Sequence, residues 1–121
     1  MLELSLLAVI RVILMTLALF IICIISIFYC LLRPFHRNNV YHTAKFIGKI
    51  TKLLGLEVEL RIPDSVKGIG PVVWMANHQN SYDLITHANA VLPGTVSVGK
   101  KSLKWIPIFG QMYWLTGNIL I

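Results

Sequence analysis

Asn77-His78-Gln79-Asn80-Ser81-Tyr82-Asp83 follows a short apolar run and places an imidazole five residues before a carboxylate. Residues five apart on one continuous helix lie about 140° apart around its axis, so the two side chains cannot meet on a single helix. They can meet where a strand ends, the chain turns sharply and a helix begins, with His78 before the helix and Asp83 in its first turn. The stretch therefore predicts a strand–turn–helix arrangement.

The same two residues predict a general base. The Asp83 carboxylate would accept the Nδ1 proton of His78, fix the tautomer and leave Nε2 free to take a proton from a substrate hydroxyl. The pair resembles a catalytic triad without its serine, so the nucleophile would be the substrate's own alcohol, which indicates transfer of a group onto a hydroxyl. In a purely structural alternative, Asn80 caps the helix and Asp83 returns a capping-box hydrogen bond.

The composition indicates a membrane-associated chain. Its 121 residues are 56% hydrophobic and 13% charged, too apolar for an ordinary soluble domain and too few for a complete α/β enzyme. Residues 12–32 carry no charge and would span roughly 30 Å as a helix, the thickness of a bilayer core. We expect residues 1–34 to form a retained anchor rather than a signal peptide. Arg11 interrupts the apolar run, so the anchor is either one membrane helix or a helical hairpin in one leaflet.

Basic residues follow the anchor, namely Arg33, Arg37, Lys45, Lys49 and Lys52. The positive-inside bias therefore places the bulk of the chain in the cytoplasm. A formal net charge of +6 can indicate nucleic acid, but these residues flank a membrane segment. Membrane phospholipid is therefore the expected partner, and nucleic acid is not.

Beyond the anchor, residues 35–121 alternate helical and extended patterns, as in an α/β fold. We expect helices over residues 40–54 and 81–91, and strands over 57–62, 72–76, 95–98 and 118–121. The first helix is amphipathic and ends at Gly55. Residues 72–76 are apolar throughout, like a strand buried on both faces, and His78 follows the carboxyl end of that strand, where sites form in open α/β sheets.

A second segment, residues 100–110, joins a basic cluster to an apolar, aromatic loop. Its lysines, which include Lys100 and Lys101, could hold a phosphate or the acidic groups of a carrier protein, while Trp105 and Phe109 could contact an acyl chain or the membrane. The alternative is a surface loop whose aromatic side chains pack on the core.

Together the two segments resemble motifs of the glycerolipid acyltransferases, and within them of the bacterial 1-acyl-sn-glycerol-3-phosphate acyltransferases. The resemblance covers about residues 32–121. The family's Asn-His-x4-Asp motif matches Asn77, His78 and Asp83, and its Lys-x2-Leu-x3-Pro-x2-Gly segment matches Lys100, Leu103, Pro107 and Gly110.

The resemblance implies an α/β acyltransferase held on the cytoplasmic face of the bacterial inner membrane. It would move a fatty acyl group from acyl-CoA or acyl carrier protein to the free hydroxyl of lysophosphatidate, giving phosphatidate. His78 would deprotonate that hydroxyl and Asp83 would orient the imidazole. Asn77 would shape the turn, and Lys100 and Lys101 would help to form a substrate site. No metal or bound cofactor is expected.

The chain also departs from the family pattern. We find no counterpart of the family's phosphate-gripping Phe-Pro-Glu-Gly-Thr-Arg motif, so residues 35–121 are expected to be the N-terminal portion of an acyltransferase domain that is incomplete at its C-terminus. Alone, such a chain should be weakly active or inactive, and a separate C-terminal half could be its partner.

Two other classes stay open. One is a non-catalytic, membrane-anchored protein that binds lipid or a partner. The other is a metal-dependent hydrolase that uses His78 and Asp83, which is poorly supported because a catalytic metal usually needs three protein ligands and the remaining histidines are scattered along the chain.

Overall fold

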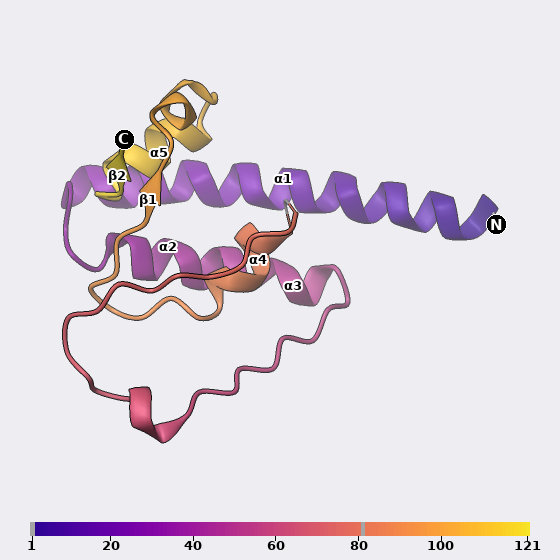
Figure 1. Cartoon of the computed structure of the whole chain (residues 1–121). Coiled ribbons are helices and arrows are strands. Elements are labelled where there is room, and N and C mark those ends of the chain that lie inside the picture. The colour runs from indigo at the N-terminus through magenta and orange to yellow at the C-terminus, as the bar shows by residue number, and fades with distance from the viewer. Residues whose placement is uncertain (1, 81) are drawn as a thin grey trace.

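The computed structural model describes residues 2–80 and 82–121. A long helix, α1 (Leu2–Leu32), runs across the molecule, and the other elements pack along it (Figure 1). On one side of α1 lie α2 (Asn39–Gly48), α3 (Ile50–Leu53) and α4 (Asp83–Ala88). On its other side lies α5 (Phe109–Leu115). Short 3-10 turns occur at Asp64–Val66 and Lys101–Trp105.

The N-terminal segment is one uninterrupted helix. It passes through Arg11 without a break, so the helical-hairpin alternative was wrong. The helix also begins ten residues before the charge-free run at residues 12–32, because Leu4, Leu7 and their neighbours form helix as readily as the run itself. By length and composition α1 could cross a membrane.

The amphipathic helix expected over residues 40–54 is present as α2 and α3, which are offset from each other at Lys49. Its apolar positions Ala44, Ile47, Ile50 and Leu54 are buried and its lysines are exposed, which confirms the predicted faces. The chain leaves α3 through Gly55 in the left-handed region at a φ of 71°, as expected for a residue just past a helix C-terminus.

The core is built where three helical segments meet. Ile85 and Ala88 of α4 join the buried face of α2 and α3. Four residues of α1 pack against this cluster: Met15, Ala18, Leu19 and Ile22. The expected anchor α1 is therefore also part of the folded domain, and α4 is held against α2 and α3 on the core that α1 covers.

Two predicted strands are absent. Residues 57–62 and 72–76 form no strand, and the second segment, expected to be buried, exposes Val73 and Met75 by 90% and 93%. A strand is stable only where a neighbour pairs with its backbone N–H and C=O groups, and the described residues provide no such neighbour here. The helix expected over 81–91 is also shorter, spanning Asp83–Ala88, and Ser81 lies outside the described residues.

One small parallel sheet forms from the other two predicted strands, β1 (Val98–Gly99) and β2 (Ile119–Leu120), which pair Val98 with Ile119 and Gly99 with Leu120. The connection between them contains α5, which packs on α1, and the Tyr113 hydroxyl of α5 donates a hydrogen bond to Ser97 Oγ at 2.8 Å. The described structure is thus helix-rich with a two-stranded sheet, and the α/β class stays a prediction.

Candidate active site

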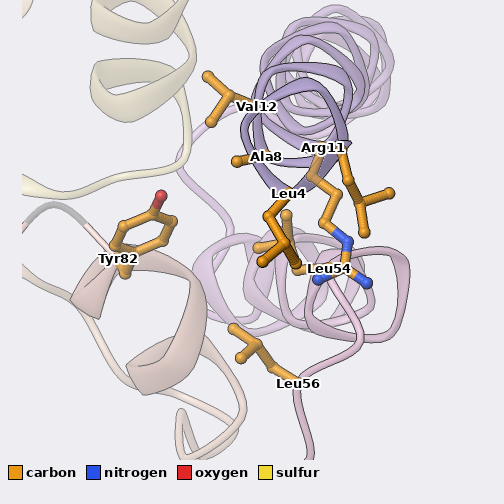
Figure 2. Close-up of a pocket in the computed structure, with 8 residues that line it drawn as sticks. Leu4, Ala8, Arg11, Val12, Leu54, Leu56 and Tyr82 are labelled. Atoms are coloured by element: carbon orange, nitrogen blue, oxygen red, sulfur yellow. The ribbon is translucent and has the colours of Figure 1, made fainter. Parts of the chain in front are cut away.

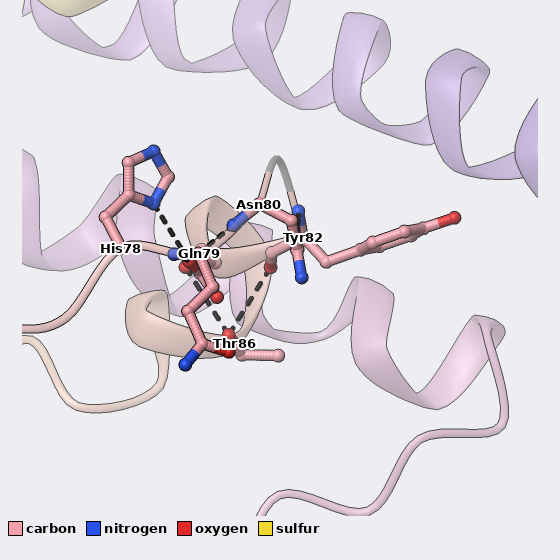
Figure 3. Close-up of polar contacts among 6 residues, drawn as sticks. His78, Gln79, Asn80, Tyr82 and Thr86 are labelled. Carbon is pink, nitrogen blue, oxygen red and sulfur yellow. Dashed lines mark hydrogen bonds and ion pairs between the residues drawn. The ribbon is translucent and has the colours of Figure 1, made fainter.

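The first turn of α4 and the residues before it bring His78 and Asp83 together. His78 Nδ1 lies 2.9 Å from Asp83 Oδ2. The backbone N–H groups of Gln79 and Asn80 donate hydrogen bonds to the same carboxylate oxygen, at 2.5 and 3.1 Å (Figure 3). One oxygen thus closes the turn and contacts the imidazole, as the five-residue spacing requires.

The carboxylate is held in its ionised form. Hydrogen bonds from the backbone N–H groups of Asn80 and Gln79, followed by the contact with His78, lower the pKa of Asp83 to about 2. An ionised carboxylate can only accept hydrogen bonds, so Nδ1 of a neutral His78 must carry the hydrogen of the shared bond. This leaves Nε2 as a proton acceptor.

The two ends of this pair differ in exposure. The side chain of His78 is 72% exposed, whereas that of Asp83 is only 17% exposed. The imidazole can therefore meet a substrate while the carboxylate behind it stays sheltered within the turn. A general base must be accessible to the substrate, whereas the carboxylate that orients it can be sheltered from solvent.

The capping interpretation is confirmed only in part. Tyr82, and not Asn80, is the N-cap residue of α4, where no side chain makes a capping hydrogen bond, but the expected return bond from Asp83 is present. Asn80 Oδ1 accepts a hydrogen bond from the Tyr82 N–H at 2.9 Å, and Asp83 accepts the N–H of Asn80. The turn is therefore stabilised by the same carboxylate that touches His78, and the structural and chemical interpretations are compatible.

The remaining predicted site residues lie apart from this pair or add no side-chain contact to it. Asn77 is exposed and directly precedes His78. Lys100 and Lys101 are also exposed, at the end of β1, where the Lys101 N–H donates to the Ile121 carbonyl at 2.7 Å. Among the described residues, no hydrogen bond or ion pair joins either lysine to the pair formed by His78 and Asp83.

The residues with metal-ligand side chains are dispersed. Within residues 2–80 and 82–121, no group of three or more His, Cys, Asp or Glu side chains could hold a metal ion. The part of the chain that the structure describes therefore offers no set of three metal ligands that would support a metal-dependent hydrolase.

Two contributors were missed by the sequence analysis. The backbone N–H of Gln79 is invisible in a search for reactive side chains, although a polar run before a helix is a signal for such turns. Tyr82 lines a groove against α1, which lies some seventy positions earlier in the sequence, so only the fold reveals it.

Comparison with known proteins gives the family. The family model described as Acyltransferase matches residues 57–121, more than half of the chain. This chain belongs to the acyltransferase family. The matched region contains both motifs that carried the sequence resemblance, which is thereby confirmed.

Curated acyltransferases share extensive identity with it. The 1-acyl-sn-glycerol-3-phosphate acyltransferase of Salmonella typhimurium is 48% identical over 101 residues, which are 84% of this chain and 41% of the relative. That of Haemophilus influenzae is 44% identical over 111 residues, 92% of this chain and 46% of the relative. The human alpha enzyme is 32% identical over 101 residues, 83% and 35% of the two chains. The chain thus spans less than half of the length of these relatives. No solved structure matches it.

The pKa of Asp83 yields a test of the turn. Because the folded-state pKa lies below the ordinary value of about 3.9, the ionised carboxylate stabilises the fold above about pH 4, and this stabilisation is lost as the pH falls through about 2. We expect Asp83→Asn to lower the unfolding temperature at pH 7. Near pH 2 the unfolding temperatures of the variant and of the unsubstituted chain should become similar. Thermal unfolding in detergent micelles across this range measures the effect. A deficit independent of pH would show that the charge is not what holds the turn.

Proposed function

We propose that this chain carries the general base of a 1-acyl-sn-glycerol-3-phosphate acyltransferase. It would transfer a fatty acyl group from acyl-CoA or acyl carrier protein to the free hydroxyl of lysophosphatidate, forming phosphatidate for phospholipid biosynthesis. The observation that carries the proposal is the 2.9 Å contact between an exposed His78 and a sheltered, ionised Asp83. The names of the curated relatives support the choice of substrate class.

The chemistry follows from the tautomer. His78 Nε2 takes the proton of the acceptor hydroxyl while the oxygen attacks the thioester carbonyl, and Asp83 stabilises the imidazolium that forms. When the tetrahedral intermediate collapses, the carbon–sulfur bond breaks and the imidazolium returns the proton to the leaving thiolate. The base thus ends the cycle neutral, and no covalent enzyme intermediate is needed.

The more distant site residues take secondary roles in this proposal. Asn77 shapes the chain before His78. Lys100 and Lys101 would contact anionic groups of the acyl donor, since both are exposed at the end of β1. The parallel pairing of β1 and β2 around α5 supports an α/β acyltransferase domain over residues 35–121.

We also propose that α1 lies in the cytoplasmic leaflet of the membrane and does not cross it. One side of α1 packs on the core, whereas the other exposes Leu17, Phe20 and Phe28, the last by 66%. A spanning α1 would carry α2 and its exposed lysines into the bilayer, at a cost of roughly 3 kcal/mol for each charge at the bilayer centre. Lying in the plane of the leaflet, α1 buries its apolar face and leaves the lysines in water.

Removing the base tests the reaction. We expect His78→Ala to lower acyl transfer roughly 100-fold or more, because general-base catalysis contributes on that scale. The assay measures phosphatidate formed in vesicles from lysophosphatidate and labelled acyl-CoA or acyl carrier protein. Gln79→Ala is the matched control, since it removes a neighbouring side chain but keeps the backbone N–H on Asp83.

Because the chain spans less than half of its relatives, the assay is run on the chain alone and again with the portion of the Haemophilus influenzae relative that the chain does not cover. Transfer that survives His78→Ala in both settings, in folded protein, would contradict the proposed base. Equal loss in Gln79→Ala would assign the effect to the turn and not to the imidazole.

The membrane arrangement has its own test. If α1 lies in one leaflet, cysteines introduced as Glu3→Cys and Arg37→Cys, one near each end, should both react with a membrane-impermeant maleimide from the cytoplasmic side of sealed vesicles. The native Cys23 and Cys30 are buried and give a low background. Labelling of the two positions from opposite sides would show that α1 spans the membrane.

A further inference from the structure

The 3-10 turn before α5 carries an exposed aromatic tip, formed by Lys104, Trp105 and Ile106. The side chain of Trp105 is 75% exposed, and Ile106 beside it is also exposed. Lys104 Nζ lies 4.7 Å from the centre of the Trp105 ring, so a cation stacks on the tip. Phe109, in contrast, stacks on Tyr113 of α5. Only part of this aromatic loop therefore packs on the domain, and Trp105 stays outside it.

A strained backbone turn supports the tip. Ile108 has a φ of 66° and a ψ of −57°, and the Phe109 N–H donates a hydrogen bond to the Pro107 carbonyl at 2.7 Å. These values make Ile108 the central residue of a γ-turn of the rare, strained kind. A β-branched residue seldom adopts a positive φ. Such strain persists only where neighbouring contacts fix the chain.

Close packing at Gly110 supplies contacts of this kind. A Cβ added to Gly110 would collide with the carbonyl oxygens of Leu103 and Lys104, so the turn lies directly on the first residues of α5. The Gly110 N–H also donates a hydrogen bond to the Ile106 carbonyl at 2.8 Å. The tip is thus braced from beneath, and Trp105 is presented to the surroundings instead of being folded onto the core.

Helix α5 connects the tip to the end of α1 that leads into α2 (Figure 1). Trp114 of α5 packs edge-to-face on Phe35 with ring centroids 5.0 Å apart, and the Phe35 N–H donates to the Leu115 carbonyl at 3.3 Å. Trp114 and Phe35 are both partly exposed, as is Phe28 of α1. Exposed aromatic rings therefore extend from α1, which is proposed to lie in the leaflet, to the helix that supports the tip.

The charge of this region suits an anionic surface. Residues 84–121 contain no Asp or Glu, whereas Lys100, Lys101 and Lys104 lie in or beside the turn. In the part of the chain that the structure describes, no ion pair neutralises any of these lysines. At a membrane interface tryptophan lies at the level of the headgroups and lysine attracts anionic lipid, so the tip has the composition of an interfacial anchor.

We propose that this tip inserts into the headgroup region of an anionic bilayer, with the Trp105 ring among the lipid glycerol groups and Lys104 at the phosphates. It would be a second membrane contact besides α1, and it does not rest on the proposed reaction. The acyl chain of a donor fits less well, because an alkyl chain is bound in an enclosed apolar site and Trp105 is exposed beside positive charge. Two contacts would hold the domain in one orientation, whereas α1 alone could roll about its axis.

Quenching of tryptophan fluorescence by lipid tests the contact. Trp74→Phe with Trp114→Phe leaves Trp105 as the one tryptophan of the full chain, and Trp105→Phe with Trp114→Phe leaves Trp74, which is 52% exposed, as the matched control. Both are placed in vesicles of phosphatidylglycerol and phosphatidylcholine brominated near the ester end of the acyl chains. We expect the emission of Trp105 to be shifted to shorter wavelength and to lose a larger share of its intensity than that of Trp74.

Lys104→Gln, in the chain that keeps Trp105, tests the charge. In vesicles that contain phosphatidylglycerol it should shift the equilibrium of the tip roughly fivefold away from the bilayer and so reduce quenching, with less effect in pure phosphatidylcholine. Lys52→Gln removes an exposed lysine of α3 with the same change in net charge and should leave the quenching as it is. Equal reduction by both variants would overturn the role of Lys104.

Three results would overturn the inserted tip. One is equal quenching of Trp105 and Trp74, and another is a Trp105 that ignores bilayer lipid but is quenched by added brominated acyl-CoA. The third comes from Trp105→Cys carrying an environment-sensitive fluorophore in a chain that keeps its other tryptophans, if the fluorophore emits as it does in water. The buried Cys23 and Cys30 give little background.

The tip and the proposed reaction fail separately. His78→Ala should lose acyl transfer and keep the quenching of Trp105. Transfer without quenching would exclude the tip as a membrane contact and keep the reaction, whereas quenching in a chain that shows no transfer in either assay setting would do the reverse.

Discussion

The hydrogen bonds gathered on one oxygen of Asp83 are the constraint on which the site depends. Two backbone N–H groups and the imidazole of His78 share this acceptor, so the turn before α4 and the orientation of the base are fixed together. The same contacts keep the carboxylate ionised. Losing the carboxylate would therefore release the imidazole and loosen the turn at once, and a structural role for Asp83 is part of its chemical one.

This constraint acts only if α4 itself is held in place. Ile85 and Ala88 anchor α4 in the core, and α1 closes that core from the other side. The long apolar helix therefore has two tasks in this proposal, because α2, α3 and α5 pack against part of its surface while a further face with Leu17, Phe20 and Phe28 stays exposed and is available to lipid. A base held against a helix that lies in the leaflet would meet an acceptor whose acyl chain is already in the membrane.

The local chemistry was predictable from the sequence, and the sheet was not. A five-residue spacing constrains His78 and Asp83 through geometry that needs no distant contact, and the alternation of Ala44, Ile47 and Ile50 with lysines shows its buried face directly. The segment at residues 72–76 has the composition of a buried strand, but strand formation depends on partners elsewhere in the chain, and the described residues supply none. For the same reason the sequence could not predict that Tyr82 lines a groove against α1, because that contact follows from how α1 packs (Figure 2).

The tautomer of His78 tests the proposed general base most directly. Nitrogen-15 NMR of histidine-labelled chain in micelles distinguishes a protonated Nδ1 from a protonated Nε2, and assignment is made by the loss of one signal in His78→Ala. We expect neutral His78 to carry its hydrogen on Nδ1 and Asp83→Ala to remove this preference. A hydrogen on Nε2 in the folded chain would contradict the proposed base, because Asp83 would then not prepare His78 to accept a proton.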